Sequence, residues 1–179
     1  MCMPLPSPTP YHLGPEAGHA FWCAGALLTV KAAGAETGGR FWLLEVLAAR
    51  GQITPLHTHQ REDQAWYVLD GELRCRLGER TIRAPRATFV YLPRGVPHSL
   101  VVETPVARLL VLGSPAGAER FFWDAGEPAR ALTLPPPARP PDAARLRAAW
   151  AAYGVDVAES SETPWRDRWA RSSTQPAAR

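Results

Sequence analysis

Two histidines separated by a single residue, His57 and His59, are the feature of this sequence that most directly suggests chemistry. On a β-strand, residues two apart point to the same face, so both imidazoles would project to one side of a sheet. Two imidazoles that converge from one strand supply half of a transition-metal site. An H-x-H pair can also be two ordinary polar residues on a sheet face, so the flanking sequence is needed to distinguish this from a metal site.

The flanking sequence is regular around both this pair and a third histidine, His98. Five residues separate Gly51 from His57, and the stretch that follows His59 ends at Gly71. His98 closes the run A-T-F-V-Y-L-P-R-G-V-P-H. These two segments resemble the two signature motifs of the cupin family. The first motif reads glycine, five residues, H-x-H, three or four residues, an acid, six residues and glycine. The second reads glycine, five residues, P-x-G, two residues, histidine, three residues and asparagine.

The resemblance covers residues 51–102 and implies a metal site. It implies that His57, His59 and His98 bind one divalent transition metal ion, which could be Zn, Fe, Ni, Cu, Mn or Co. The family's acidic ligand falls on Gln64, with six residues between it and Gly71, so we expect Gln64 as the fourth ligand. A cupin that has lost its metal, with Gln64 as an interior polar residue, is the alternative.

The sequence departs from the family pattern at three positions. Gln64 stands where the family has glutamate, and Asp63 fits that position only with the shorter upstream spacing and one extra residue before Gly71. Ala87 replaces the first glycine of the second motif, which we expect to be harmless at the start of a strand, and Val102 replaces the asparagine. With Gln64 all four ligands would be neutral, so a bound metal keeps its full charge and acidifies bound water or phenol. An amide is not a useful base near neutral pH, so Gln64 cannot serve as a general base.

Other residues are candidates for the walls of the site. Trp66 shares the strand parity of Gln64, and we expect it beside the metal and the substrate; core packing is the alternative. We expect Glu45 to face outward and Glu62 to lie with Asp63 in a solvated turn. His12 and His19 are expected to be ordinary arm or surface residues. The further wall candidates are Leu100, Val102, Phe41, Trp42, Phe89 and Tyr91.

Short apolar runs separated by turn residues predict an all-β fold. Asp70-Gly71 is a hairpin signal, because a tight turn there needs a residue that accepts positive φ. Together with the resemblance, this predicts a double-stranded β-helix, the cupin or jelly-roll barrel, with short C-terminal helices. We expect strands at 21–31, 40–48, 53–57, 65–69, 72–77, 80–84, 88–92, 98–103 and 106–112.

The ends of the chain differ from the middle. We expect an extended Pro-rich arm at 1–12, the barrel at 13–115, an extension with short helices at 116–159 and a polar tail at 160–179. A helix is expected over 116–124. A second is expected over 143–153, between an N-cap at Asp142 and a stop at Gly154. Its apolar stripe of Leu146, Trp150 and Tyr153 should pack on the barrel.

Composition excludes several classes of protein. The net charge is +3, but no run of basic residues gathers the charge, so a nucleic-acid partner is not expected. The three cysteines match no zinc or redox motif, and we expect reduced thiols. No apolar stretch approaches the ~20 residues of a membrane helix, and the first residues lack a signal-peptide pattern. We therefore expect a cytoplasmic protein.

The string H-x-H-x-R-E-D-x-x-x-Y-V-L-x-G-E and the Pro-rich segment after G-x-E-R-F-F resemble the single-domain quercetin 2,3-dioxygenase-like cupins. The resemblance implies a dioxygenase that acts on a phenolic or enolic small molecule, of flavonoid or polyketide type. Because Gln64 replaces the glutamate base, a non-redox Lewis-acid cyclase or isomerase, similar to monocupin polyketide cyclases, is the alternative. A cupin that binds or senses a small molecule without catalysis is the second alternative. The family also implies a homodimer.

Overall fold

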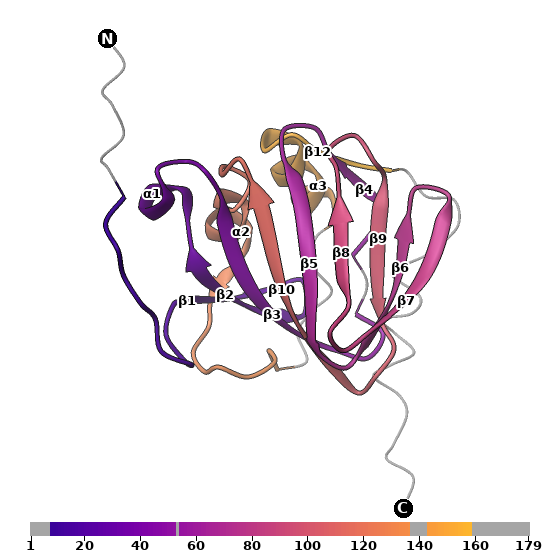
Figure 1. Cartoon of the computed structure of the whole chain (residues 1–179), viewed down its shortest axis with the longest axis horizontal. Helices are drawn as coiled ribbons and strands as arrows, with labels where there is room; N and C mark the ends of the chain where they lie inside the picture. Colours follow the sequence, from indigo (N-terminus) through magenta and orange to yellow (C-terminus); the bar gives the residue numbers. More distant parts are fainter. Residues whose placement is uncertain (1–7, 53, 137–142, 159–179) are drawn as a thin grey trace, which may run out of the picture.

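The computed structural model describes residues 8–52, 54–136 and 143–158 of the chain, and it has the predicted all-β jelly-roll fold (Figure 1). Two antiparallel sheets face each other across the core. The larger sheet has the order β11 (Glu127–Pro128), β1 (His19–Cys23), β2 (Ala26–Ala32), β3 (Trp42–Ala49), β10 (Val106–Ser114), β5 (Asp63–Asp70) and β8 (Phe89–Leu92). The smaller has the order β12 (Val155–Val157), β4 (His57–His59), β9 (His98–Val102), β6 (Glu72–Leu77) and β7 (Arg80–Pro85).

The first strands of the chain form a hairpin, whereas the sequence predicted a single strand over 21–31. β1 and β2 pair with Cys23 opposite Ala26, so a two-residue turn of Ala24 and Gly25 joins them. Both turn residues have positive φ, 49° and 89°, as a tight hairpin turn requires. The prediction was wrong here because Gly25 was the one turn signal in an otherwise apolar run, and it stands beside an alanine that gives none.

The Asp70-Gly71 pair is a corner between sheets, so the hairpin prediction was wrong. β5 belongs to the larger sheet and β6 to the smaller one. Gly71 has a φ of 79°, and a Cβ there would lie 2.6 Å from both Thr104 Oγ1 and Val106 O. Glycine is therefore required at this position by conformation and by space. The Asp-Gly signal reflects only a local preference for positive φ, and a corner between two sheets has the same preference.

The strand expected at 53–57 is also different. β4 covers only His57–His59, so the H-x-H pair is the strand itself, and Ile53 lies outside the described residues. A partner for β4 comes from a segment that the sequence did not predict as a strand. β12 pairs with β4 so that Val155 lies opposite His59 and Val157 opposite His57. The C-terminal segment is thus a structural support for the histidine-bearing strand.

Three helices complete the described chain: α1 (Gly34–Thr37), α2 (Arg120–Ala125) and α3 (Ala143–Ala152). In Figure 1, α3 lies at the end of the molecule where β4 and β12 lie. Leu146, Trp150 and Tyr153 pack against the main core cluster, as their stripe predicted. The expected N-cap at Asp142 and the tail from residue 160 lie outside the described residues.

The inward faces of both sheets form the core, which includes Val68, Leu73, Cys75, Leu100 and Val102. Leu100 and Val102 share the parity of His98, but they are packing residues of the core and not walls of the site. Phe89 and Tyr91, in contrast, point away from the interior and are 62% and 56% exposed. They are not walls of the site. Cys23 and Cys75 are free and buried.

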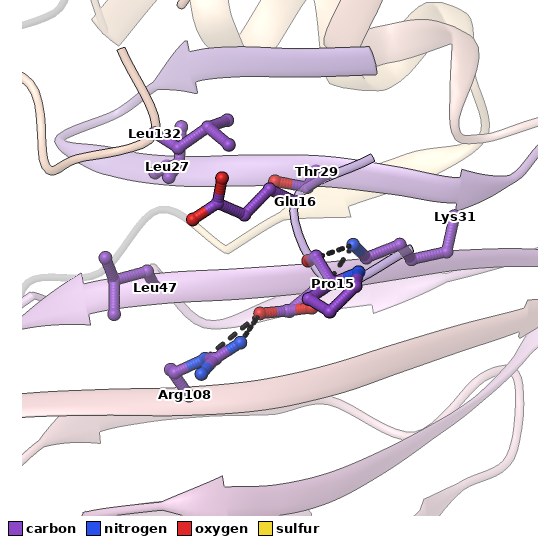
Figure 2. A pocket seen from close by; sticks show the side chains of 9 residues that line it. Pro15, Glu16, Leu27, Thr29, Lys31, Leu47, Arg108 and Leu132 are labelled. Atoms are coloured by element: carbon purple, nitrogen blue, oxygen red, sulfur yellow. Dashed lines mark hydrogen bonds and ion pairs between the residues drawn. The ribbon is translucent and has the colours of Figure 1, made fainter. Parts of the chain in front are cut away.

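The outer face of the larger sheet carries charged residues at its centre (Figure 2). Glu45 faces outward as expected, with its Oε2 3.4 Å from Lys31 Nζ and its Oε1 3.0 Å from Arg108 Nε. These side chains line a pocket of about 340 Å³ that also includes Pro15 and Leu132. Glu45 is already paired with Lys31 and Arg108, and none of the histidines lines the pocket, so it is not a candidate for metal chemistry.

Candidate metal centre

His57, His59 and His98 come together inside the barrel as the sequence predicted. His57 and His59 both point inward from β4, and His98 lies opposite His57 on the neighbouring strand β9. All three are buried, with exposures of 7%, 8% and 1%. One ring nitrogen from each lies within 4.8 Å of the others, which is the convergence that a single ion needs.

Backbone carbonyls orient two of these imidazoles. His57 Nδ1 lies 2.8 Å from the Pro55 carbonyl, and His98 Nδ1 lies 2.8 Å from the Val96 carbonyl. A carbonyl only accepts hydrogen bonds, so each Nδ1 carries the proton and each Nε2 keeps a lone pair. The buried Nε2 of His98 has no hydrogen-bond partner among the described residues. A buried nitrogen without a partner is costly unless an ion or ligand uses it.

Burial also keeps these imidazoles neutral. Desolvation, with the neighbouring His98 and His59, holds the pKa of His57 well below its usual range. Desolvation is likewise the main cause that lowers the pKa of His98 to about 4. Because a metal binds the neutral imidazole, both residues are ready to bind one at neutral pH without first losing a proton.

Aromatic side chains enclose the cluster on two sides. Trp66 projects inward from β5, and its ring meets that of His98 edge-on with centroids 5.5 Å apart. Trp150 of α3 lies over His57 with centroids 5.6 Å apart, and it also contacts Phe121. Trp66 thus lies beside the histidine cluster, and its role toward a substrate stays a prediction. Trp150 adds a wall that the sequence placed only on the barrel surface.

Glu62 is the residue of the site that the sequence reasoning placed wrongly. It was expected in a solvated turn, but it is 3% exposed and points inward. Its Oε2 accepts a hydrogen bond of 2.8 Å from Trp42 Nε1. Its Oε1 lies 2.8 Å from His59 Nδ1, off the direction of the ring N–H. The signal was available: Glu62 shares the parity of Gln64 and Trp66, both of which were assigned to the interior.

Asp63 faces the other way and pairs with Arg94. Its Oδ1 lies 3.0 Å from Arg94 Nε, and this pairing lowers the pKa of Asp63 to about 2. It is therefore not a candidate ligand. The two histidines outside the motif, His12 and His19, are exposed as expected.

Gln64 lies against the cluster, as its motif position implied. Its Nε2 is 3.0 Å from His59 Nε2 and 3.1 Å from Glu62 Oε1. Its Oε1 accepts a hydrogen bond of 3.3 Å from Trp66 Nε1. The expectation that Gln64 is the fourth ligand stays a prediction.

The donor set fits a divalent transition metal. Three imidazoles suit Zn, Fe, Ni, Cu and Co, and three protein ligands leave positions for water or substrate. Beside the cluster, Glu62 also lines a cavity of about 440 Å³ between the loop at residues 115–118 and the end of α3. Arg61, Arg120 and Tyr153 line the same cavity.

Known proteins resemble the chain in sequence and in fold. Residues 43–113 match the family described as Cupin domain. Quercetin 2,3-dioxygenase of Bacillus subtilis (strain 168) is 28% identical over 128 residues, which are 71% of this chain and 38% of that protein. The chain thus spans well under half the length of this relative.

Solved structures agree on the fold. An RmlC-like cupin from Shewanella frigidimarina NCIMB 400 matches with a TM-score of 0.54 and 18% identity, over 62% of this chain and 96% of that one. Pac13 of Streptomyces, a nucleoside dehydratase, matches with a TM-score of 0.52 and 18% identity, over 70% and 95%. At such identities the likeness establishes the fold and leaves the reaction open.

Proposed function

We propose that this chain, which belongs to the cupin superfamily through its domain at residues 43–113, is a metal-dependent enzyme of the quercetinase-like kind. Its reaction is the oxygen-dependent cleavage of a phenolic or enolic small molecule. The observation that carries this proposal is the convergence of His57, His59 and His98 as three buried imidazoles, two of them with free Nε2 lone pairs. The similarity to quercetin 2,3-dioxygenase supports the substrate class.

A bound divalent metal would supply a Lewis acid that lowers the pKa of a phenol or enol. The protein's own contribution is to hold three imidazole donors and to exclude water. Trp66 and Trp150 present flat apolar rings at the edges of the cluster, which suit a planar aromatic ligand. The low dielectric of this site would strengthen every interaction with a developing oxyanion.

A second candidate function is favoured by one residue, Gln64. A glutamine at the family's glutamate position cannot accept the substrate proton. A non-redox Lewis-acid cyclase or isomerase does not require oxygen, and it is the alternative that fits a neutral residue here. The second alternative is a cupin that binds or senses a small molecule without turnover.

Metal analysis followed by an oxygen-uptake assay separates these functions. The purified protein is loaded in turn with iron, nickel, copper, cobalt and zinc and supplied with flavonols and enolic polyketides. Substrate-dependent oxygen uptake is the expected result. Equal turnover with and without air would assign the cyclase class, and ligand binding without turnover would assign the sensor. His57→Ala and His98→Ala should each abolish stoichiometric metal, and exposed His19→Ala is the matched control.

We also propose a homodimer. Tyr67, Phe89 and Tyr91 are exposed on the outer faces of β5 and the edge strand β8, and Tyr67 pairs directly with Phe89. An exposed aromatic cluster of this kind is typical of protein interfaces. Within the described residues no helix is long and apolar enough to cross a membrane.

A further inference from the structure

The side-chain amide of Gln64 has its nitrogen, and not its oxygen, turned toward the histidines. Its Nε2 lies 3.0 Å from His59 Nε2, whereas its Oε1 lies against Trp66. A glutamine that binds a metal does so through its oxygen, because the amide nitrogen has no available lone pair. The observed orientation is therefore the one that does not ligate.

Two neighbours fix this orientation. The indole Nε1 of Trp66 can only donate, so it needs the amide oxygen, which is 3.3 Å away. The Glu62 carboxylate can only accept, so it needs the amide nitrogen, which is 3.1 Å away. Reversing the amide would place two donors together at Trp66 and two acceptors together at Glu62. Both contacts are buried, where such mismatches are most costly.

Glu62 is itself held in place. Its second oxygen, Oε2, accepts the 2.8 Å hydrogen bond from Trp42 Nε1, and Trp42 is 1% exposed. The chain Trp42–Glu62–Gln64–Trp66 is thus continuous, and each donor meets an acceptor. A buried network that is fully satisfied in one arrangement specifies that arrangement.

We propose that Gln64 is a hydrogen-bond donor to a substrate oxygen and not a metal ligand, and that Glu62 is the positioning residue that holds it so. This inference rests on the proposed function for the metal on the three histidines. Gln64 Nε2 has two hydrogens, one directed to Glu62 Oε1 and the other to the lone pair of His59 Nε2. When a metal takes that lone pair, the second hydrogen loses its acceptor. A phenolate or enolate oxygen bound in the site then supplies a new one.

The inference is tested by separating zinc binding from ligand binding. Gln64→Leu removes the amide with little change in volume, and exposed Gln60→Ala, which loses only a bond to Asp156, is the matched control. Zinc affinity of Gln64→Leu should stay within about threefold of the wild type, because Gln64 is neither a ligand nor the partner of a ligand's other ring nitrogen, whose loss typically costs about 10- to 100-fold. Binding of 4-nitrocatechol to the zinc-loaded protein should weaken roughly 10- to 100-fold, because a hydrogen bond to a charged oxygen is lost.

Glu62→Gln tests the positioning role. A glutamine at residue 62 can donate as well as accept, so the Gln64 amide is no longer held. Nitrocatechol binding should weaken in Glu62→Gln, and adding Gln64→Leu to it should cost little more, because both changes remove one interaction. Full additivity of the two effects would overturn the role of Glu62.

The Trp66 indole resonance reports the amide directly. In the metal-free protein it should move upfield in Gln64→Leu, and in the wild type it should stay hydrogen-bonded when zinc is added. Zinc affinity that falls more than about 30-fold in Gln64→Leu, with an upfield Trp66 shift on zinc addition, would make Gln64 the ligand. Unchanged nitrocatechol affinity would overturn the donor role. A wild type that binds no zinc would refute the proposed function, while the metal-free Trp66 shift would still decide the amide orientation.

Discussion

Zinc binding by this protein should survive acidification to pH 5 to an unusual degree. A histidine with an ordinary pKa of about 6.5 is roughly 97% protonated at pH 5, which costs about 30-fold in metal affinity. Two such histidines would together cost about a thousandfold. Here the pKa of His98 is lowered to about 4 and that of His57 lies well below its usual range. His98 should therefore be only about 10% protonated at pH 5 and cost almost no zinc affinity, and His57 should cost far less than an ordinary histidine would.

The measurement is zinc affinity at pH 7 and pH 5 against a chelator of known pH dependence, with buffers that do not bind zinc. The exposed histidine variant His19→Ala should behave as the wild type, because that side chain lies outside the cluster. A thousandfold loss at pH 5 would refute the reasoning, since it would mean that His57 and His98 titrate as solvent-exposed imidazoles.

The same shift has a consequence for the metal-free protein. A folded-state pKa below the unfolded one means that the unfolded chain binds protons first as the pH falls. The contribution of His98 to stability is therefore complete above pH 6.5 and declines toward pH 4, by about 3 kcal/mol in all. Urea unfolding of the metal-free protein should show this decline, and it should be smaller in His98→Leu.

Three further changes test other parts of the structure. Ala87→Gly should raise the free energy of unfolding by about 0.5–1 kcal/mol in urea titrations, because Ala87 has a φ of 68°, where alanine is strained and glycine is not; Ala87→Val should lower it. Gly71→Ala should lower the free energy of unfolding by about 3 kcal/mol, because of the left-handed φ of 79° and the contacts at 2.6 Å. An effect near zero would contradict the corner geometry. Phe89→Ser with Tyr91→Ser should convert the proposed dimer to a monomer in light scattering, and an unchanged dimer mass would remove this face as the interface.

The histidine cluster was predictable from the sequence because its geometry follows from strand periodicity and from the spacing of two motifs. His57 and His59 share a face by parity, and the motif around Pro93-Arg94-Gly95 brings His98 to the adjacent strand. The corner at Gly71 and the hairpin at Ala24 were not predictable in the same way. Local turn preference does not say which sheet the next strand joins. At the hairpin, Gly25 is a single turn signal, and the alanine beside it gives none although its φ is also positive.

Ala87 shows the limit of treating a motif departure as neutral. The motif alone predicts that this position is the start of a strand, where alanine costs nothing. In the structure β8 begins two residues later, and Ala87 lies in the turn before it with a φ of 68°. The glycine of the motif is thus explained by backbone conformation, and its replacement carries a cost that the motif alone does not reveal.

The carboxylate that the motif lacks at residue 64 is present one inward-facing position earlier, at Glu62. Strand parity places both side chains in the interior, but their neighbours give them different roles. Glu62 reaches Trp42 and the Gln64 amide, and it lies beside the Nδ1 of His59. A carboxylate in this place does not replace the family's base at residue 64. It orients the Gln64 amide so that the N–H, and not the oxygen, faces the histidines. The site is thereby suited to a substrate oxygen that accepts a hydrogen bond.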